Sequence, residues 1–172
     1  MGVNALVKKV LAEVGIKPER FNLQWASAAE APRFVKLITE FTQKIKELGP
    51  IGQAEGLDAE EVKAKLKIAL NLVNDRKVRM SFGTATRSIR KEGDFSQKHI
   101  TEVIDSKLGG TINTGIIENG LLTALEQSGP VSLSKLLEQV GAPKEDAEKI
   151  LAALTKQGKV EQKGKKWALA AS

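Results

Sequence analysis

Apolar residues recur at spacings of three and four along most of this chain, which predicts a largely helical protein. Residues 3–14 place their valines and leucines on one side of a first helix, which Gly15 closes. Phe21, Leu23 and Trp25 then alternate with polar residues in the period-two pattern of a half-buried strand. The same stretch is equally compatible with an extended connector between two helices.

A long amphipathic helix follows, and it carries one continuous apolar stripe. Ser27 and Glu30 have the spacing of a capping box, whereas Pro32, which favours the first turn of a helix, is compatible with a start at Ala31 instead. Gly49-Pro50 should stop it after about five turns. Its apolar positions are Phe34, Leu37, Ile38, Phe41, Ile45 and Leu48.

Capping and breaking residues divide the middle of the chain. Asp58 and Glu61 have the capping-box spacing before a helix that runs to about Lys77. Gly83 is expected to break the helical pattern, so that residues 84–91 form a further short helix.

The strongest predicted break is the glycine-rich and threonine-rich segment 109–115, which follows a helix capped by Ser96. A domain boundary is expected there. The resulting interpretation has three parts: residues 1–53, a helical extension over 54–112, and a third domain over 113–172.

The third domain resembles a winged helix-turn-helix in its order of elements. Three short helices are expected, followed by a β-hairpin over residues 159–169. Val160, Trp167 and Leu169 would cover the helices. The predicted fold class is therefore mainly α, with an N-terminal βα fragment, a helical middle and a winged helix-turn-helix that includes a small β-hairpin.

Composition excludes several classes of protein. The chain has 172 residues, no cysteine, and no apolar run close to the roughly 18 residues that span a membrane. Its first residues are too charged for a signal-peptide core, so a cytoplasmic location is expected. The net charge of +6 is spread along the chain, which is weak support for a polyanion-binding surface.

Residues 3–52 resemble the C-terminal end of the methyl-viologen-reducing hydrogenase delta-subunit family. The matching runs are 15–20, Trp25 to Glu30, Arg33-Phe34, Glu40 to Thr42, and Ile45 to Pro50. The resemblance implies a subunit that passes electrons between a hydrogenase and heterodisulfide reductase through a cysteine-bound iron–sulfur cluster. This chain has no cysteine, so no cofactor is expected in it. Whether the chain is a piece of a longer delta subunit stays open.

Residues typical of enzyme active sites are sparse. His99 is the single histidine and is interpreted as a surface side chain. The glycines of the 109–115 segment are not followed by the Gly-Lys-Ser/Thr of a phosphate loop. Catalysis by this chain alone is therefore not expected, and its catalytic and metal-binding residues are predicted to be none.

DNA binding is the alternative that the winged-helix resemblance raises. The first turn of the third helix of that domain is rich in carboxylates, which phosphate would repel. Phosphate or an acidic partner could instead contact Lys163, Lys165 and Lys166 in the hairpin, or Arg87 and Arg90 in the middle of the chain. Lysines at a hairpin and arginines on a helix can equally be solvated surface residues.

The function predicted is a non-catalytic interaction module of a cytoplasmic electron-transfer complex; the alternative is a winged-helix transcription regulator that binds DNA. The partner would be a hydrogenase subunit or a heterodisulfide-reductase-like subunit. The residues expected to bind it are Trp25, Glu30, Arg33, Phe34 and Phe41. A homodimer that pairs two copies of residues 21–25 is a second arrangement, and a helix over residues 62–73 that covers the apolar stripe is a third.

Overall fold

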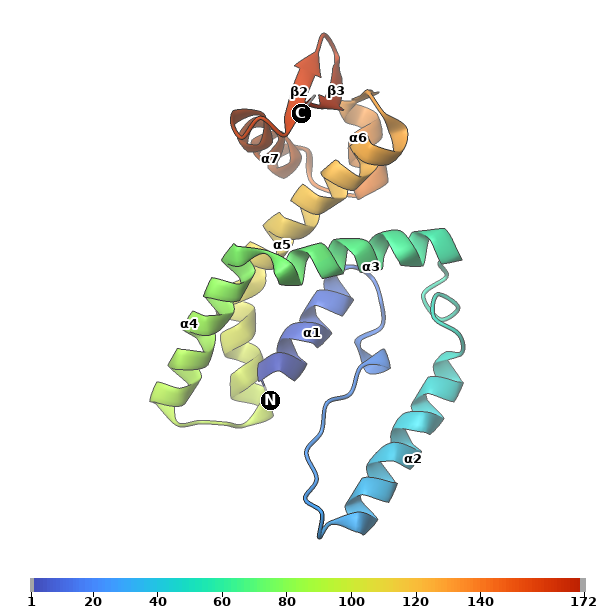
Figure 1. Ribbon diagram of the computed structural model, residues 1–172, viewed down its shortest axis with the longest axis vertical. Coiled ribbons are helices and arrows are strands. Elements are labelled where there is room, and N and C mark those ends of the chain that lie inside the picture. Colours follow the sequence, from blue (N-terminus) through green and yellow to red (C-terminus); the bar gives the residue numbers. More distant parts are fainter. Residues whose placement is uncertain (1, 171–172) are drawn as a thin grey trace. The chain divides into compact units, whose positions relative to one another are not determined.

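The computed structural model describes residues 2–170, which form helices and one small sheet (Figure 1). The chain divides into two compact units, one ending at Gly109 and one beginning at Gly110. The prediction of a mainly α protein with a small C-terminal β-structure is confirmed.

The regular elements of the first unit are all helices. Its elements are α1 (Gly2–Glu13), the 3₁₀ helix η1 (Pro18–Arg20), α2 (Ala31–Leu48), α3 (Ala59–Asn74), α4 (Arg76–Glu92) and the first part of α5 (Gln97–Ser128). α1, α3, α4 and α5 supply most of its buried side chains, which include Val10, Leu72, Val78, Ile89, Ile104 and Leu108. The predicted starts and ends of α1 and α2 are confirmed to within a residue or two.

Residues 21–25 do not form a strand, so the predicted βα fragment is wrong. They run as an extended connector between η1 and α2. A strand needs a neighbour to bond its backbone groups, and this part of the structure provides none. The backbone N–H of Leu23 instead donates to the side-chain oxygen of Asn4 in α1, at 3.3 Å.

Asp75 separates α3 from α4 and makes a sharp corner between them. Its backbone N–H donates to the carbonyl of Leu72 at 3.1 Å, while its carboxylate accepts from the backbone N–H of Lys77 at 2.6 Å and of Val78 at 3.4 Å. One residue thus closes α3 and caps α4. The predicted break at Gly83 is wrong: Gly83 lies inside α4, and residues 84–91 are not a separate helix.

The predicted break at 109–115 is also wrong, because α5 continues through it. Gly109 and Gly110 each cost about 1 kcal/mol of helix propensity relative to alanine. Leu108 and Ile112 are four residues apart and fully buried, so packing on one face outweighs that cost.

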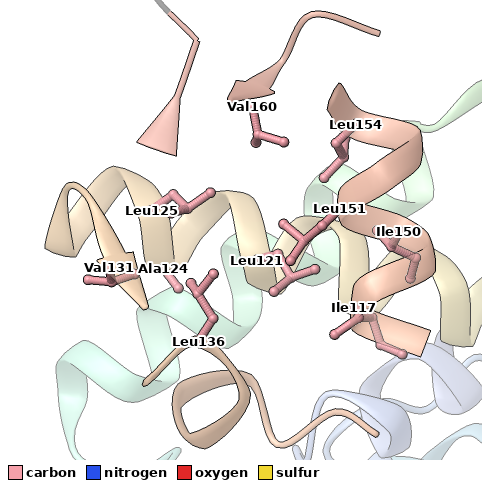
Figure 2. Packing of buried hydrophobic residues seen from close by; sticks show 11 residues of the cluster. Ile117, Leu121, Ala124, Leu125, Val131, Leu136, Ile150, Leu151, Leu154 and Val160 are labelled. Carbon is pink, nitrogen blue, oxygen red and sulfur yellow. The ribbon is translucent and has the colours of Figure 1, made fainter. Parts of the chain in front are cut away.

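The second unit surrounds one apolar core. After the end of α5 come β1 (Val131–Ser132), α6 (Leu133–Val140), α7 (Lys144–Lys156), β2 (Val160–Lys163) and β3 (Lys166–Leu169). The antiparallel sheet has the order β1-β3-β2, with Val131 opposite Trp167 and Gln162 opposite Trp167 on its other side. Figure 2 shows leucines, isoleucines and valines from α5, α6, α7 and β2 meeting in the core.

The hairpin follows the sequence prediction with one exception. Val160 is buried and Trp167 packs against the core, as expected. Leu169 is 38% exposed because it is the last residue of β3, and Ala168 is buried in its place. β1 was not predicted, since two residues are too few to show a strand pattern.

Candidate partner-binding surface

Arg20 fixes the C-terminal end of α2. Its guanidinium donates to three carbonyls at and just after the helix end: Gly49 at 2.8 Å, Pro50 at 3.0 Å and Leu48 at 3.2 Å. Gly49 itself has a φ of +66°, a conformation that glycine adopts without strain. Arg20 therefore ties η1 to the far end of a helix that begins eleven residues later in the chain.

Glu55 completes this arrangement from the loop before α3. Its carboxylate binds the Nε and Nη2 of Arg20 at 2.8 Å and 3.0 Å, and it also accepts the backbone N–H groups of Lys17 and Gly52, both at 3.1 Å. The Glu55 side chain is 1% exposed. Hydrogen bonding from Arg20, helped by the two backbone N–H groups, lowers the pKa of Glu55 to about 2.

α2 exposes its apolar stripe. None of its residues is buried; Phe34 is 56% exposed and Ile38 is half exposed, while Phe41 and Ile45 are partly exposed. A contiguous apolar surface of this kind marks an interaction site more often than a solvated face. The alternative arrangement, in which residues 62–73 cover the stripe, is not seen: α3 buries Val62, Ala69 and Leu72, whereas no residue of α2 is buried.

The five residues predicted to bind a partner lie on the connector and on α2. Trp25 is 67% exposed on the connector. Phe34 and Phe41, seven residues apart, share the apolar stripe. Glu30 and Arg33 form an exposed ion pair at 3.0 Å just before and within the first turn of α2.

Glu30 also organises the start of α2. Its carboxylate accepts the backbone N–H of Ser27 at 2.8 Å, which is half of the predicted capping box. The Ser27 side chain makes no reciprocal cap bond, and Pro32 occupies the second helical position. The Ser27 backbone, and then Arg33, lower the pKa of Glu30 to about 2.

The predicted basic residues belong to two different units of the chain. Arg87 and Arg90 lie on α4 in the first unit, whereas Lys163, Lys165 and Lys166 lie on the hairpin of the second. Lys163 pairs with Glu161 at 2.7 Å. These two groups are therefore considered separately.

His99 is partly buried rather than a fully exposed side chain. Its Nε2 lies 2.8 Å from a carboxylate oxygen of Glu92. Across residues 2–170, no group of three or more acidic or histidine side chains is arranged to hold a metal ion. The helices of the same part of the chain include none that is long and apolar enough to cross a membrane.

Sequence reasoning missed Arg20 and Glu55 as the residues that position α2. They are 35 residues apart, and neither belongs to a periodic pattern. Val35, which is 62% exposed beside the stripe, was missed as well, because it falls outside the strict spacing of the other apolar positions.

The comparison with known proteins points to the same segment. Residues 3–49 match the family model FlpD, methyl-viologen-reducing hydrogenase, delta subunit. Among curated proteins, 47 residues are 45% identical to a ferredoxin:CoB-CoM heterodisulfide reductase subunit from Methanosarcina mazei, over 27% of this chain and 6% of that protein.

Iron–sulfur subunits of F420-non-reducing hydrogenases match the same region. The similarity is 47% identity over 45 residues for the protein of Archaeoglobus profundus and 48% over 44 residues for the vhu protein of Methanopyrus kandleri; each match covers 26% of this chain and 33% of the relative. The chain thus spans at most a third of the relatives it matches. No solved structure matches it.

The iron–sulfur cluster that these names imply does not fit the residues of this chain. Such clusters are held by cysteine thiolates, and the sequence contains none. The matched segment does contain α1 and the exposed stripe of α2. It also contains Arg20, whose bonds to the carbonyls at the end of α2 are called the Arg20 clamp below.

Proposed function

We propose that this chain is a non-catalytic docking module of a cytoplasmic electron-transfer complex of the hydrogenase and heterodisulfide reductase type. One observation carries the proposal: the apolar stripe of α2 is exposed, and it lies within the segment that resembles subunits of such complexes. A helix whose apolar face is left open gains stability when a partner covers it.

The proposed contact residues are Phe34 and Phe41 in the stripe, with Trp25 beside them on the connector. Aromatic side chains at the centre of an interface contribute most of the binding energy in many complexes. Glu30 and Arg33 would form the polar rim, where their ion pair is already exposed to solvent.

The Arg20 clamp supports this function because it holds α2 in place without burying it. The clamp bonds the last carbonyls of the helix and leaves the stripe clear. A preformed helix loses less conformational entropy on binding than one that must order first.

The second unit is proposed to be a winged-helix-like domain that adds protein contacts. Its order of helix, strand, helix, helix and two strands supports this interpretation. The first turn of α7 carries Glu145 and Asp146, which disfavour contact with phosphate. We further propose functional parts at residues 1–53, 54–112 and 113–172.

The test is binding to purified hydrogenase and heterodisulfide reductase from the organism that encodes this chain, measured by surface plasmon resonance. Phe34→Asp should weaken binding at least about tenfold, because it puts a charge into the stripe. Thr39→Asp adds the same charge on an exposed position away from the stripe and should leave binding unchanged. Absence of binding to both complexes, or equal loss in the two variants, would refute the proposal.

A further inference from the structure

α4 has two sharply different faces. Val78, Ala85 and Ile89 are buried against the rest of the first unit. The opposite face is exposed and carries six cations: Arg76, Lys77, Arg79, Arg87, Arg90 and Lys91. Within residues 2–170 none of the six takes part in an ion pair, although acidic residues pair with lysines in most other helices.

The cations form a strip along one face of α4 in two groups, at residues 76–79 and 87–91, with no charged residue between the groups. Arg76, Arg79, Arg87 and Arg90 recur at helical intervals, and at 1.5 Å per residue the strip extends over about 20 Å. Like charges three and four residues apart repel each other. A helix that keeps them together without compensation is arranged for a partner of negative charge.

An open cleft of about 500 Å³ lies in the middle of the strip. It is lined by Met80, Ser81, Gly83, Thr84, Arg87 and, from α5, Lys107. Met80 is 61% exposed at this point, and Gly83 has no side chain to fill the space. The cleft therefore combines one exposed apolar side chain, Met80, with two hydroxyl side chains and two cations.

We propose that the basic face of α4 binds an acidic segment of a partner protein. Carboxylates of that segment would pair with the arginines, whose guanidinium groups can donate two parallel hydrogen bonds to one carboxylate. An apolar side chain of the segment would enter the cleft over Gly83 and contact Met80. The proposal is independent of the α2 stripe and of the segment that matches the delta-subunit family.

The composition of the face favours a protein segment over a nucleic acid. The exposed positions of α4 include no aromatic ring on which a base could stack and no Asn or Gln that could bind a base edge. A phosphate backbone would use the cations but would make no apolar contact with Met80. A segment with both carboxylates and an apolar residue uses both.

The experiment measures fluorescence anisotropy of a labelled helical peptide of about four turns, with glutamates on one face and one central leucine. A second peptide replaces the leucine with serine at the same charge, and a single-stranded DNA of similar length is the third probe. The full chain should bind the leucine peptide at least about fivefold more tightly than the serine peptide, with affinity falling as salt rises.

Two sets of substitutions test separately how the cations and the cleft contribute to peptide binding. Arg87→Glu with Arg90→Glu should weaken binding of the leucine peptide about tenfold or more, whereas Lys36→Glu with Lys44→Glu, the same charge change on α2, should have little effect. Gly83→Leu fills the cleft, and a Cβ there meets no atom within 4 Å, so the fold should persist. The Gly83→Leu variant should bind the leucine peptide more weakly and should bind DNA as the unaltered chain does.

Three outcomes would overturn the proposal. One is equal affinity for the leucine and serine peptides in the unaltered chain. Another is a Gly83→Leu variant of native helicity that binds the leucine peptide normally. The last is tighter binding to DNA than to the leucine peptide at the same salt concentration, which would make α4 a nucleic-acid surface.

Discussion

The guanidinium of Arg20 and the carboxylate of Glu55 face each other in a bidentate ion pair, with Nε–Oε1 at 2.8 Å and Nη2–Oε2 at 3.0 Å. The pair is almost fully enclosed, with side-chain exposures of 9% and 1%. A buried pair is not strongly stabilising in itself, because both charges lose their hydration. Its value here is geometric, since the same guanidinium also bonds the last carbonyls of α2.

Arg20→Ala should lower the free energy of unfolding of the first unit by about 3–5 kcal/mol, because it leaves the Glu55 charge buried without a partner. Arg20→Lys should also destabilise, since an ammonium cannot bond the carboxylate and the carbonyls together. Urea denaturation followed by circular dichroism measures both effects. Arg33→Ala breaks the exposed pair with Glu30 and serves as the control, with an expected loss under about 1 kcal/mol. Equal losses for Arg20→Ala and Arg33→Ala would contradict the buried role of Arg20.

Stability should fall in acid over a window that Glu55 helps to set. Its pKa is about 2 in the folded chain against an ordinary value of 4.5, so the folded state favours the ionised carboxylate. The stabilisation is fully present above pH 4.5, declines as the pH falls below that value, and is lost near pH 2. Thermal melting between neutral pH and acid should show this decline. Glu55→Gln should be less stable at pH 7 and should show a shallower decline in acid; an unchanged slope would count against the assignment.

Phe34→Asp should change the free energy of unfolding by less than about 0.5 kcal/mol, because the ring is more than half exposed. Leu72→Ala, in the core of the same unit, should cost about 2–5 kcal/mol. Chemical denaturation of the two variants in the absence of any partner makes the comparison. A strongly destabilised Phe34→Asp variant would mean that the stripe is covered within the chain.

A fragment of residues 113–172 should fold on its own. It retains Ile117, Leu121 and Leu125 of α5 together with the rest of the second core. In that fragment Leu151→Ala should cost about 2–5 kcal/mol, whereas Leu169→Ala should cost less than about 1 kcal/mol because Leu169 is partly exposed. Near-ultraviolet circular dichroism and a cooperative thermal transition would establish folding. A fragment without fixed tertiary structure would show that the core needs the preceding part of α5.

Local signals in the sequence predicted the elements whose ends depend on neighbouring residues. The capping box of Asp58 and Glu61 forms with both of its hydrogen bonds, as its spacing predicted. The errors concern elements decided by distant contacts. Gly83 and Gly109 looked like helix breaks, yet buried neighbours on the same helices keep both segments helical.

The sequence could predict which residues form the stripe of α2, but not whether the stripe is exposed. Periodicity identifies the stripe of α2, whereas whether another helix covers it depends on the paths of the loops. The alternation of Phe21, Leu23 and Trp25 suggested a strand, but a strand exists only with a partner. The Arg20–Glu55 pair joins two segments far apart in the sequence, and periodicity cannot predict such a contact.

The corner at Asp75 leaves no spare residue between α3 and α4. Adding a single residue there would turn α4 by about 100° about its axis, since a helix has 3.6 residues per turn. Val78, Ala85 and Ile89 would leave the core, and Lys77, Thr84 and Ser88 would turn into their places. The number of residues from Leu72 to Val78 therefore sets the direction in which the basic face of α4 points.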